Sequence, residues 1–201
     1  ILRVNSSGSY SFEMVKNDSQ HEDNLVSIDL IVPGKHNVRN ALAALVIIYR
    51  SSLDLARAAR LMHQFNGTGR RFDIVAETNG ITLIDDYAHH PTEIEATLEA
   101  ARSRYLHNRI WVVWQPHTFS RTQALLDRFS TAFTQADQVI ISDIFASREQ
   151  LTTFSAANLI DKIKHPHVQL IPKLADIATY LIRNIKSSDV VLVLSAGDAE
   201  Q

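Results

Sequence analysis

Three short segments in the second half of the chain are apolar along almost their whole length, and they constrain the fold most. They are IWVVW (110–114), QVIIS (138–142) and VVLVLS (190–195), and segments with apolar residues at helical spacing lie between them. A strand that is apolar on both faces has to be covered on both faces. Such strands alternating with helices predict an α/β fold with a mostly parallel sheet and helices on both of its faces.

Further segments extend this pattern. The dipeptide Asn79-Gly80 separates strand candidates at 72–77 and 81–85, which is a strong signal for a two-residue hairpin. Helices are expected over 92–103, 120–134, 155–163 and 174–185, and a further strand over 167–171. Ser120 and Gln123 fit a capping box at the start of the helix over 120–134.

The first third of the chain predicts a smaller set of elements. Strands are expected at 9–15 and 25–32, with a polar loop over 16–24 between them. A helix is expected over 38–49, where VRNALAALVIIY is apolar on most faces and so predicts burial, with Asn37 as its N-cap. A second helix is expected over 53–63, and GTGRR (67–71) has the composition of a hinge.

Composition excludes several classes of protein. The chain has no cysteine, which rules out a disulfide framework, a thiolate zinc site and a cysteine nucleophile. It has no run of about 18 apolar residues that would cross a membrane, and its net charge of −2 argues against a nucleic-acid binder built on bulk charge. We expect a cytoplasmic protein. With 201 residues and Ile1 at its start, the chain has room for one or two domains and suggests a missing upstream segment.

Chemistry-bearing residues concentrate in the loops that follow the expected strands. These loops are DDYAHHP (85–91), QPHTFSR (115–121), DIFASRE (143–149) and SAGDA (195–199), whereas the loops at the other strand ends are shorter and less varied. Ligands of open α/β sheets bind outside the carboxyl ends of the strands. The four loops therefore predict the functional edge of the sheet.

The loop DDYAHHP has three interpretations. Asp86, Tyr87 and His89 precede a helix start, where an anion is favoured. The same residues fit ordinary turn chemistry, with an aspartate as the capping group. The pairs Asp85-Asp86 and His89-His90 also fit a metal cluster.

Two pairs of residues are candidate anion ligands. His117 and Arg121 lie around a helix start, where a guanidinium is able to hold a phosphate or a carboxylate through paired hydrogen bonds; a surface arginine is the alternative. Arg70 and Arg71 lie in the glycine-flanked hinge and are able to clamp a phosphate. For this second pair, a solvated basic surface is the default interpretation.

Two amides near the first helix form a candidate nucleotide site. Asn37 and Asn40 lie in GKHNVRN (34–40). An asparagine side chain both donates and accepts hydrogen bonds, so it is able to read the edge of an adenine. Spacing alone favours a helix cap and a satisfied buried amide at these positions.

Taken in order, the segments resemble the Mur ligase family. The stretches that carry the resemblance are VPGKHNVRNALAA (32–44), FNGTGRRF (65–72), IDDYAHHPTEIEATLEAAR (84–102), WQPHTFSRTQALLDRF (114–129), DIFASRE (143–149) and LSAGD (194–198). The resemblance extends from about residue 28 to the C-terminus. Its most specific part is DYAHHPTEI followed by a QPH…SRT segment.

The resemblance implies a reaction and a domain arrangement. The family uses ATP to phosphorylate the carboxylate of a UDP-linked muramic acid, and an amine then attacks the acyl phosphate. For this chain the implied substrates are UDP-N-acetylmuramate and L-alanine, in peptidoglycan precursor synthesis. Residues 1–70 are expected to be the α+β C-terminal part of a truncated central ATPase domain, and residues 71–201 a Rossmann-like C-terminal domain.

The resemblance also implies roles for single residues. Asn37 and Asn40 match the HNxxN segment that lies by the adenine, and Asp86 matches the aspartate that holds the ATP ribose. Arg71 matches the arginine that reaches the terminal phosphate, and Arg71 and His89 are the expected catalytic residues. The positions that line the amino-acid and acyl-phosphate side are Tyr87, His89, His117 and Arg121.

Two features depart from the family pattern. Thr118 stands where family members often carry arginine, and the chain has no G-x-x-x-x-G-K-[ST] phosphate loop. The family's magnesium ligands are also expected upstream, and no metal site is expected in this chain. Three lost charge-assisted hydrogen bonds of roughly 1.5–3 kcal/mol each would weaken ATP binding by more than about a thousandfold. We expect the isolated chain to bind ATP weakly and not to catalyse ligation.

Other functions stay open at this point. A sibling in the same family attaches a pre-formed peptide to the same nucleotide sugar. A metal-dependent phosphohydrolase would use Asp85, Asp86, His89 and His90. A nucleotide-binding module would use the same loops without catalysis. The sequence does not define an oligomeric state.

Overall fold

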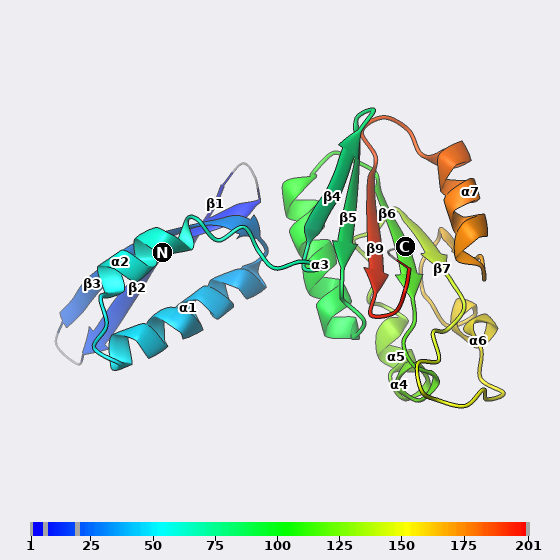
Figure 1. The fold of residues 1–201 in the computed structure, drawn as a ribbon, viewed down its shortest axis with the longest axis horizontal. Coiled ribbons are helices and arrows are strands. Elements are labelled where there is room, and N and C mark those ends of the chain that lie inside the picture. Colours follow the sequence, from blue (N-terminus) through cyan, green and yellow to red (C-terminus); the bar gives the residue numbers. More distant parts are fainter. Residues whose placement is uncertain (1, 6–7, 19–20, 200–201) are drawn as a thin grey trace. The chain divides into compact units, whose positions relative to one another are not determined.

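The chain folds into two compact units, which are described separately. The computed structural model describes residues 2–5, 8–18 and 21–199, without the side chains of 16–18 and 21–24. The first unit comprises the residues up to Gly67 together with Glu99–Leu106, and the second comprises Thr68–Leu98 and the residues from His107 onward (Figure 1).

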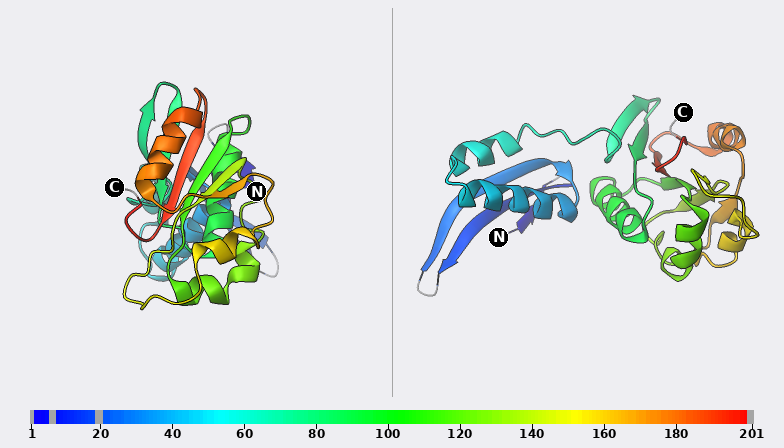
Figure 2. Two further views of the ribbon diagram at one scale, coloured as in Figure 1. Left: turned by 90° about the vertical axis from the view of Figure 1, so that its right-hand side faces the viewer. Right: turned by 60° about the horizontal axis from the view of Figure 1, so that its bottom comes forward.

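The first unit contains an antiparallel sheet and two helices. Within the described residues the strand order is β1 (Leu2–Val4), β2 (Ser9–Asp18) and β3 (His21–Pro33). α1 (Lys35–Arg50) and α2 (Leu55–Met62) pack on this sheet, and Figure 2 shows α1 running along the β2–β3 ribbon. The buried residues of this core are Phe12, Met14, Ile28, Leu30, Ala41, Leu45 and Ala59.

The polar loop predicted over 16–24 is wrong. β2 and β3 continue into this segment, where Asn17 pairs with Glu22 and Asp18 with His21. Residues 19–20, at its centre, lie outside the described residues. Strand pairing depends on backbone hydrogen bonds, so a polar run is able to continue a hairpin that its composition does not predict.

α1 differs from its prediction in both its start and its burial. The helix begins at Lys35 with Gly34 as N-cap, and the side chain of Asn37 donates to the Pro33 carbonyl oxygen at 2.7 Å instead of capping. Gly34 has φ of 94°, a conformation that favours glycine. The predicted burial is wrong for most of the helix, because only one stripe faces the sheet. Its exposed apolar residues are Leu42, Val46, Ile47 and Tyr49.

The second unit is built on a mostly parallel sheet. Within the described residues its order is β4-β5-β9-β6-β7-β8 (Figure 1). The strands are β4 (Asp73–Thr78), β5 (Ile81–Asp86), β6 (Ile110–Gln115), β7 (Gln138–Ile141), β8 (Val168–Leu170) and β9 (Val190–Ser195). Every neighbouring pair is parallel except β4 and β5, which form the hairpin predicted at Asn79-Gly80.

Helices cover both faces of this sheet, so the predicted α/β fold is confirmed. They are α3 (Pro91–Arg104), α4 (Phe119–Ala124), α5 (Leu126–Phe129), α6 (Ala156–Ile160) and α7 (Leu174–Asn184). On one face Trp111 meets Tyr180 of α7, with ring centroids 6.3 Å apart. On the other face Trp114 packs against Phe129 and Phe133 at 4.6 and 5.1 Å.

The helix predicted over 120–134 is wrong in part. Two short helices, α4 and α5, take its place, with Leu125 between them. The predicted capping box does not form, because Ser120 lies inside α4 and Thr118 occupies the N-cap position.

Candidate functional site

Loops from four neighbouring strands meet at one edge of the sheet. β5, β9, β6 and β7 are adjacent and parallel, so the segments that follow them emerge together, as predicted. The antiparallel strand β4 starts at this edge, where Asp73 pairs with Asp85. That pairing brings Arg70 and Arg71, which precede β4, to the same place.

Arg70 and Arg71 have different surroundings. Arg70 donates from Nε to Asp85 Oδ2 at 3.0 Å and from a terminal nitrogen to the Ser195 carbonyl oxygen at 2.8 Å. Arg71 makes a long ion pair of 3.7 Å with Glu93, and its side chain is 51% exposed. Arg70 therefore ties β4 to the ends of β5 and β9, and Arg71 is the arginine accessible to a ligand.

The ring of Tyr87 contacts both of these guanidinium groups. The guanidinium carbons of Arg70 and Arg71 lie 5.1 and 5.6 Å from the centroid of its ring. Its backbone N–H donates to the Arg70 carbonyl oxygen at 2.8 Å. Cation–π contacts of this length hold the guanidinium groups against an aromatic face, which restricts where Arg71 is able to point.

Asp86 is buried beneath this group. One carboxylate oxygen accepts the Phe72 N–H at 2.7 Å and the other accepts the Ala88 N–H at 2.8 Å. Burial raises the pKa of Asp86 above its usual value, although these two N–H groups and the charge of Arg71 oppose the rise. The side chain is 5% exposed, and it fixes the turn that carries Tyr87.

His89 is oriented by Tyr87 and by the first turn of α3. Its Nδ1 lies 2.8 Å from the Tyr87 carbonyl oxygen, which only accepts, so Nδ1 carries the proton. Glu93 Oε2 accepts the backbone N–H groups of His89 and His90, both at 3.1 Å. Burial would raise the pKa of Glu93, but these N–H groups and the charges of His89 and Arg71 hold it below its usual value. In the neutral tautomer that has its proton on Nδ1, Nε2 is the unprotonated ring nitrogen.

His117 and Arg121 are neighbours across the start of α4. Arg121 donates to the His117 carbonyl oxygen at 3.0 Å and approaches the imidazole Nδ1 at 3.4 Å. The His117 ring lies 6.0 Å from that of His89. Burial, Arg121 and His89 lower the pKa of His117, so its imidazole is neutral near pH 7.

Glu149 supports the start of α4 from the loop after β7. Its carboxylate accepts the hydroxyls of Thr118 and Ser120 and, at 3.0 Å, the Ser120 N–H. These hydrogen bonds lower the pKa of Glu149 from 4.5 to about 2. Thr118, which departs from the family pattern, has its hydroxyl occupied by this carboxylate.

Asn37 and Asn40, the remaining predicted site residues, lie in α1 of the first unit. Asn40 Nδ2 lies 3.5 Å from Asn37 Oδ1, and Asn37 Nδ2 donates to Pro33. The residues that the structure brings together at the sheet edge are Arg71, Asp86, Tyr87, His89, His117 and Arg121.

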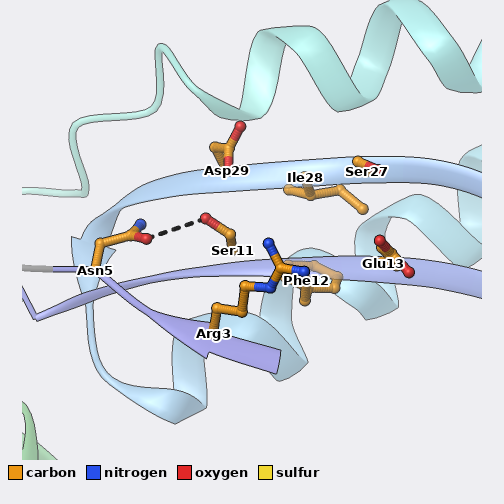
Figure 3. Close-up of a pocket in the computed structure, with 8 residues that line it drawn as sticks. All are labelled: Arg3, Asn5, Ser11, Phe12, Glu13, Ser27, Ile28 and Asp29. Atoms are coloured by element: carbon orange, nitrogen blue, oxygen red, sulfur yellow. Dashed lines mark hydrogen bonds between the residues drawn. The ribbon is translucent and has the colours of Figure 1, made fainter. Parts of the chain in front are cut away.

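A hollow of about 270 Å³ opens on the sheet of the first unit (Figure 3). The polar residues around it are Arg3, Asn5, Ser11, Glu13, Ser27 and Asp29. Asn5 accepts the Ser11 hydroxyl at 3.2 Å. Phe12 and Ile28 are the buried residues of its lining, so the hollow is an open polar face and not an enclosed site.

Among the residues whose side chains the structure describes (2–5, 8–15 and 25–199), no group of three or more histidine, aspartate or glutamate side chains is arranged to hold a metal ion. The two aspartates that a metal-dependent phosphohydrolase would use have other partners. Asp85 is paired with Arg70, and Asp86 accepts backbone N–H groups. In the same part of the chain, no helix combines the length and the apolar character needed to span a bilayer.

Sequence reasoning missed three contributors to this edge. Glu93 is interpreted from sequence only as a partner of the helix dipole, and Phe145 and Glu149 only as parts of a loop. Phe145 stacks on His117, and the two acids hold the starts of α3 and α4. The one available signal is that 143–149 follows a predicted strand and mixes aromatic and charged residues.

Residues 70–197 match the family described as Mur ligase, glutamate ligase domain. The chain belongs to the Mur ligase family, which confirms the resemblance drawn from its motifs. The match covers the second unit from Arg70, so the site at the carboxyl edge lies within the part of the chain that defines the family.

The curated relatives and one of the solved structures share a name. The UDP-N-acetylmuramate–L-alanine ligase of Alkaliphilus metalliredigens is 47% identical over 176 residues, which cover 86% of this chain and 38% of that protein. The enzyme of the same name from Clostridium botulinum (strain Kyoto / Type A2) is 42% identical over 191 residues, which cover 94% and 41%. The crystal structure of UDP-N-acetylmuramate-alanine ligase MurC from Thermotoga maritima matches with a TM-score of 0.77 and 27% identity, over 96% of this chain and 41% of that one. The chain thus spans about two fifths of the length of these relatives.

Proposed function

We propose that this chain is the C-terminal part of a cytoplasmic, ATP-dependent ligase that joins L-alanine to UDP-N-acetylmuramate in peptidoglycan precursor synthesis. The observation that carries the proposal is the gathering of Arg71, Tyr87, His89, His117 and Arg121 at one sheet edge. Relatives of that name at 42–47% identity support it. Residues 1–70 would complete a central ATPase domain, and residues 71–201 would be the C-terminal Rossmann-like domain.

The proposed reaction forms an amide from an acyl phosphate. The amine nitrogen attacks the carbonyl carbon, the bond from that carbon to the phosphate oxygen breaks, and the nitrogen loses a proton. ATP supplies the phosphoryl group as a substrate. Two tasks fall to the protein: holding the phosphoryl oxygens and taking up the proton.

Arg71 and His89 fit these two tasks. The guanidinium of Arg71 is half exposed and held against Tyr87, so its N–H groups are available to phosphoryl oxygens. His89 keeps its Nδ1 proton on the Tyr87 carbonyl, and its Nε2 is then the atom that accepts a proton from the amine.

His117 and Arg121 fit the carboxylate of the amino acid. A guanidinium only donates, so the His117 Nδ1 that faces Arg121 is an acceptor and the ring proton lies on Nε2. That N–H and the remaining donors of Arg121 are the groups that would hold an alanine carboxylate. Neutral His117 avoids repelling the cationic amine of the same substrate.

Some of the described residues suit contacts to the ribose and the adenine of ATP, but they do not form a set of ligands for Mg²⁺. Asp86 accepts two N–H groups and the Thr97 hydroxyl, which leaves about one of its four lone-pair sites for a ribose hydroxyl, and its side chain is 5% exposed. Asn37 and Asn40 retain amide groups for an adenine edge. The described residues offer no cluster of carboxylates for Mg²⁺, and no step is assigned to a metal.

The test is ligation by the full-length polypeptide that contains this chain. ATP, UDP-N-acetylmuramate and labelled L-alanine should yield the amide, ADP and phosphate. Arg71→Ala and His89→Ala should each lower kcat/KM about a hundredfold or more. The exposed residues Arg183, on α7, and His107, before β6, provide matched controls whose alanine variants should keep wild-type activity.

Three other outcomes would replace the proposal. A clear preference for a pre-formed tripeptide over L-alanine would assign the recycling reaction instead. Phosphate release that needs a divalent metal and no amino acid would assign a phosphohydrolase. Binding of ATP without any product would leave a nucleotide-binding module.

A further inference from the structure

The Phe145 ring lies flat against the His117 imidazole. The ring centroids are 5.5 Å apart, with an angle of 15° between the planes. The backbone holds this arrangement, because the Phe145 N–H donates to the Pro116 carbonyl oxygen at 2.8 Å and His117 forms a parallel bridge with Phe145. The loop after β7 is thus fastened to the loop after β6 where the two rings meet.

Gly197 lies against the same Phe145 ring. A Cβ atom at Gly197 would lie 2.8 Å from Phe145 Cγ and closer still to Gln115 Oε1, nearer than side chains tolerate. The turn after β9 therefore approaches the ring through backbone atoms alone. Any side chain at this position would displace either the ring or the Gln115 amide.

Gln115 holds this turn in place. Its Oε1 accepts the Ser195 hydroxyl at 2.7 Å and the Asp198 N–H at 3.2 Å, and its Nε2 donates to Asp198 Oδ1 at 2.8 Å. The Ser195 hydroxyl oxygen in turn accepts the Gly197 N–H at 2.9 Å. Gln115 is 5% exposed, so this network is shielded from competing water.

We propose that Phe145 is a positioning residue that fixes the orientation of the His117 ring, with Gly197 and Gln115 as its support. The role in ligation rests on the proposed function. The 3.4 Å approach of Arg121 to Nδ1 is too long to hold the ring by itself. Phe145 lies nearly parallel to the imidazole in an offset stack, and that contact determines the direction in which Nε2 points toward a substrate carboxylate.

The first test follows the His117 ring by NMR in the 201-residue chain. Stacking on Phe145 shields the His117 ring protons, so Phe145→Leu should move their resonances downfield and bring the His117 pKa closer to its ordinary value. Phe145→Tyr keeps an aromatic face and should restore the wild-type shifts. Gly197→Ala should disturb the same resonances without removing the aromatic ring.

Gly80→Ala is the matched control. A Cβ atom at Gly80 would lie against Ser187 Oγ, nearer than side chains tolerate, and the φ of 75° at Gly80 adds backbone strain, but Gly80 belongs to the β4–β5 turn at the opposite end of the strands. That variant should lose stability and leave the His117 resonances unchanged. Unchanged His117 shifts and pKa in both Phe145→Leu and Gly197→Ala would overturn the proposal, whatever the enzyme activity.

The second test uses the full-length polypeptide. Phe145→Leu should lower kcat/KM for the amino acid roughly tenfold to a hundredfold, with an unchanged KM for ATP, and Phe145→Tyr should restore it. An equal loss for both substrates would contradict positioning through His117. If the wild-type protein joins no amino acid at all, the proposed function fails, and the NMR result still decides the role of Phe145.

Discussion

Arg70 and Arg71 are adjacent and chemically identical, but they have different contacts and therefore different expected roles. Arg70 binds Asp85 and the Ser195 carbonyl, whereas Arg71 is half exposed beside Tyr87. The sequence predicts a basic pair in a hinge and does not separate its members. Only the register of β4 on β5, which fixes where each side chain lies, makes the distinction.

Alanine variants of these two arginines should separate in stability. Arg70→Ala leaves the buried Asp85 carboxylate without its guanidinium, and we expect a loss of roughly 1.5–3 kcal/mol in the free energy of unfolding. Arg71→Ala should change that free energy by less than about 0.5 kcal/mol. Urea unfolding of the two variants gives the comparison, and equal losses would show that Arg70 is not the structural partner.

The lowered pKa of Glu149 predicts that its contribution to the free energy of unfolding depends on pH. Its pKa is lowered from 4.5 to about 2 in the folded chain by the Ser120 and Thr118 hydroxyls and the Ser120 N–H. A depressed carboxyl pKa stabilises the folded state above the unfolded value, and this stabilisation is lost as the pH falls from 4.5 through about 2. Glu149→Gln should therefore destabilise the chain near neutral pH and have a smaller effect in acid.

Urea unfolding of Glu149→Gln and the wild type at about pH 7 and about pH 3 measures this difference. Glu95→Gln, at an exposed position of α3, is the control and should show little change at either pH. If Glu149→Gln lowers the free energy of unfolding equally at both pH values, Glu149 stabilises the fold through its shape and not through its charge.

At the scale of elements, α1 shows how far composition alone predicts burial. Its sequence is apolar on most faces, but the sheet of the first unit covers only the stripe that contains Ala41 and Leu45. Ile47 is 67% exposed on the same helix. The sequence does not indicate which face of α1 packs on the sheet, because several faces of the helix are equally apolar.

Substitutions on the two faces of α1 should differ in effect. Leu45→Ala removes a fully buried side chain and should cost about 2–5 kcal/mol. Ile47→Gln should alter the free energy of unfolding by less than about 0.5 kcal/mol and should reduce any self-association of the chain. Urea unfolding and sedimentation velocity test both expectations, and a large destabilisation by Ile47→Gln would show that this face is packed.

Other elements differ in how well their sequences predict them. β6 and β9 are buried on both faces, so their apolar runs mark them clearly, and β9 coincides with its prediction. The break between α4 and α5 at Leu125 has no local signal of this kind in the sequence. The site shows the same contrast. The loops that carry it are predictable from the sequence, whereas the contacts of Phe145 and Glu149 depend on how those loops meet in the folded chain.

At the scale of the whole molecule, the two units carry different spectroscopic reporters. Both tryptophans of the chain, Trp111 and Trp114, lie in β6 of the second unit and are buried. The first unit has a smaller core and more exposed apolar surface on α1. We therefore expect it to unfold at a lower denaturant concentration.

Tryptophan fluorescence and far-ultraviolet circular dichroism should then give different unfolding curves. Fluorescence reports the second unit alone, whereas circular dichroism also reports the helices and strands of the first. An early phase should be visible only in circular dichroism. Coincident curves would show that the two units unfold as one cooperative structure.

The antiparallel edge strand has a mechanical consequence. β4 begins where β9 ends, at the carboxyl ends of the parallel strands, because β4 is antiparallel to β5 and β5 is parallel to β9. A tension applied between the segment before β4 and the segment after β9 would therefore peel strands apart one residue pair at a time, instead of shearing them along their length. Arg70 precedes β4 and donates hydrogen bonds to Asp85 in β5 and to Ser195 at the end of β9. It therefore links the two points at which the force is applied, across the strand pairs that would separate first.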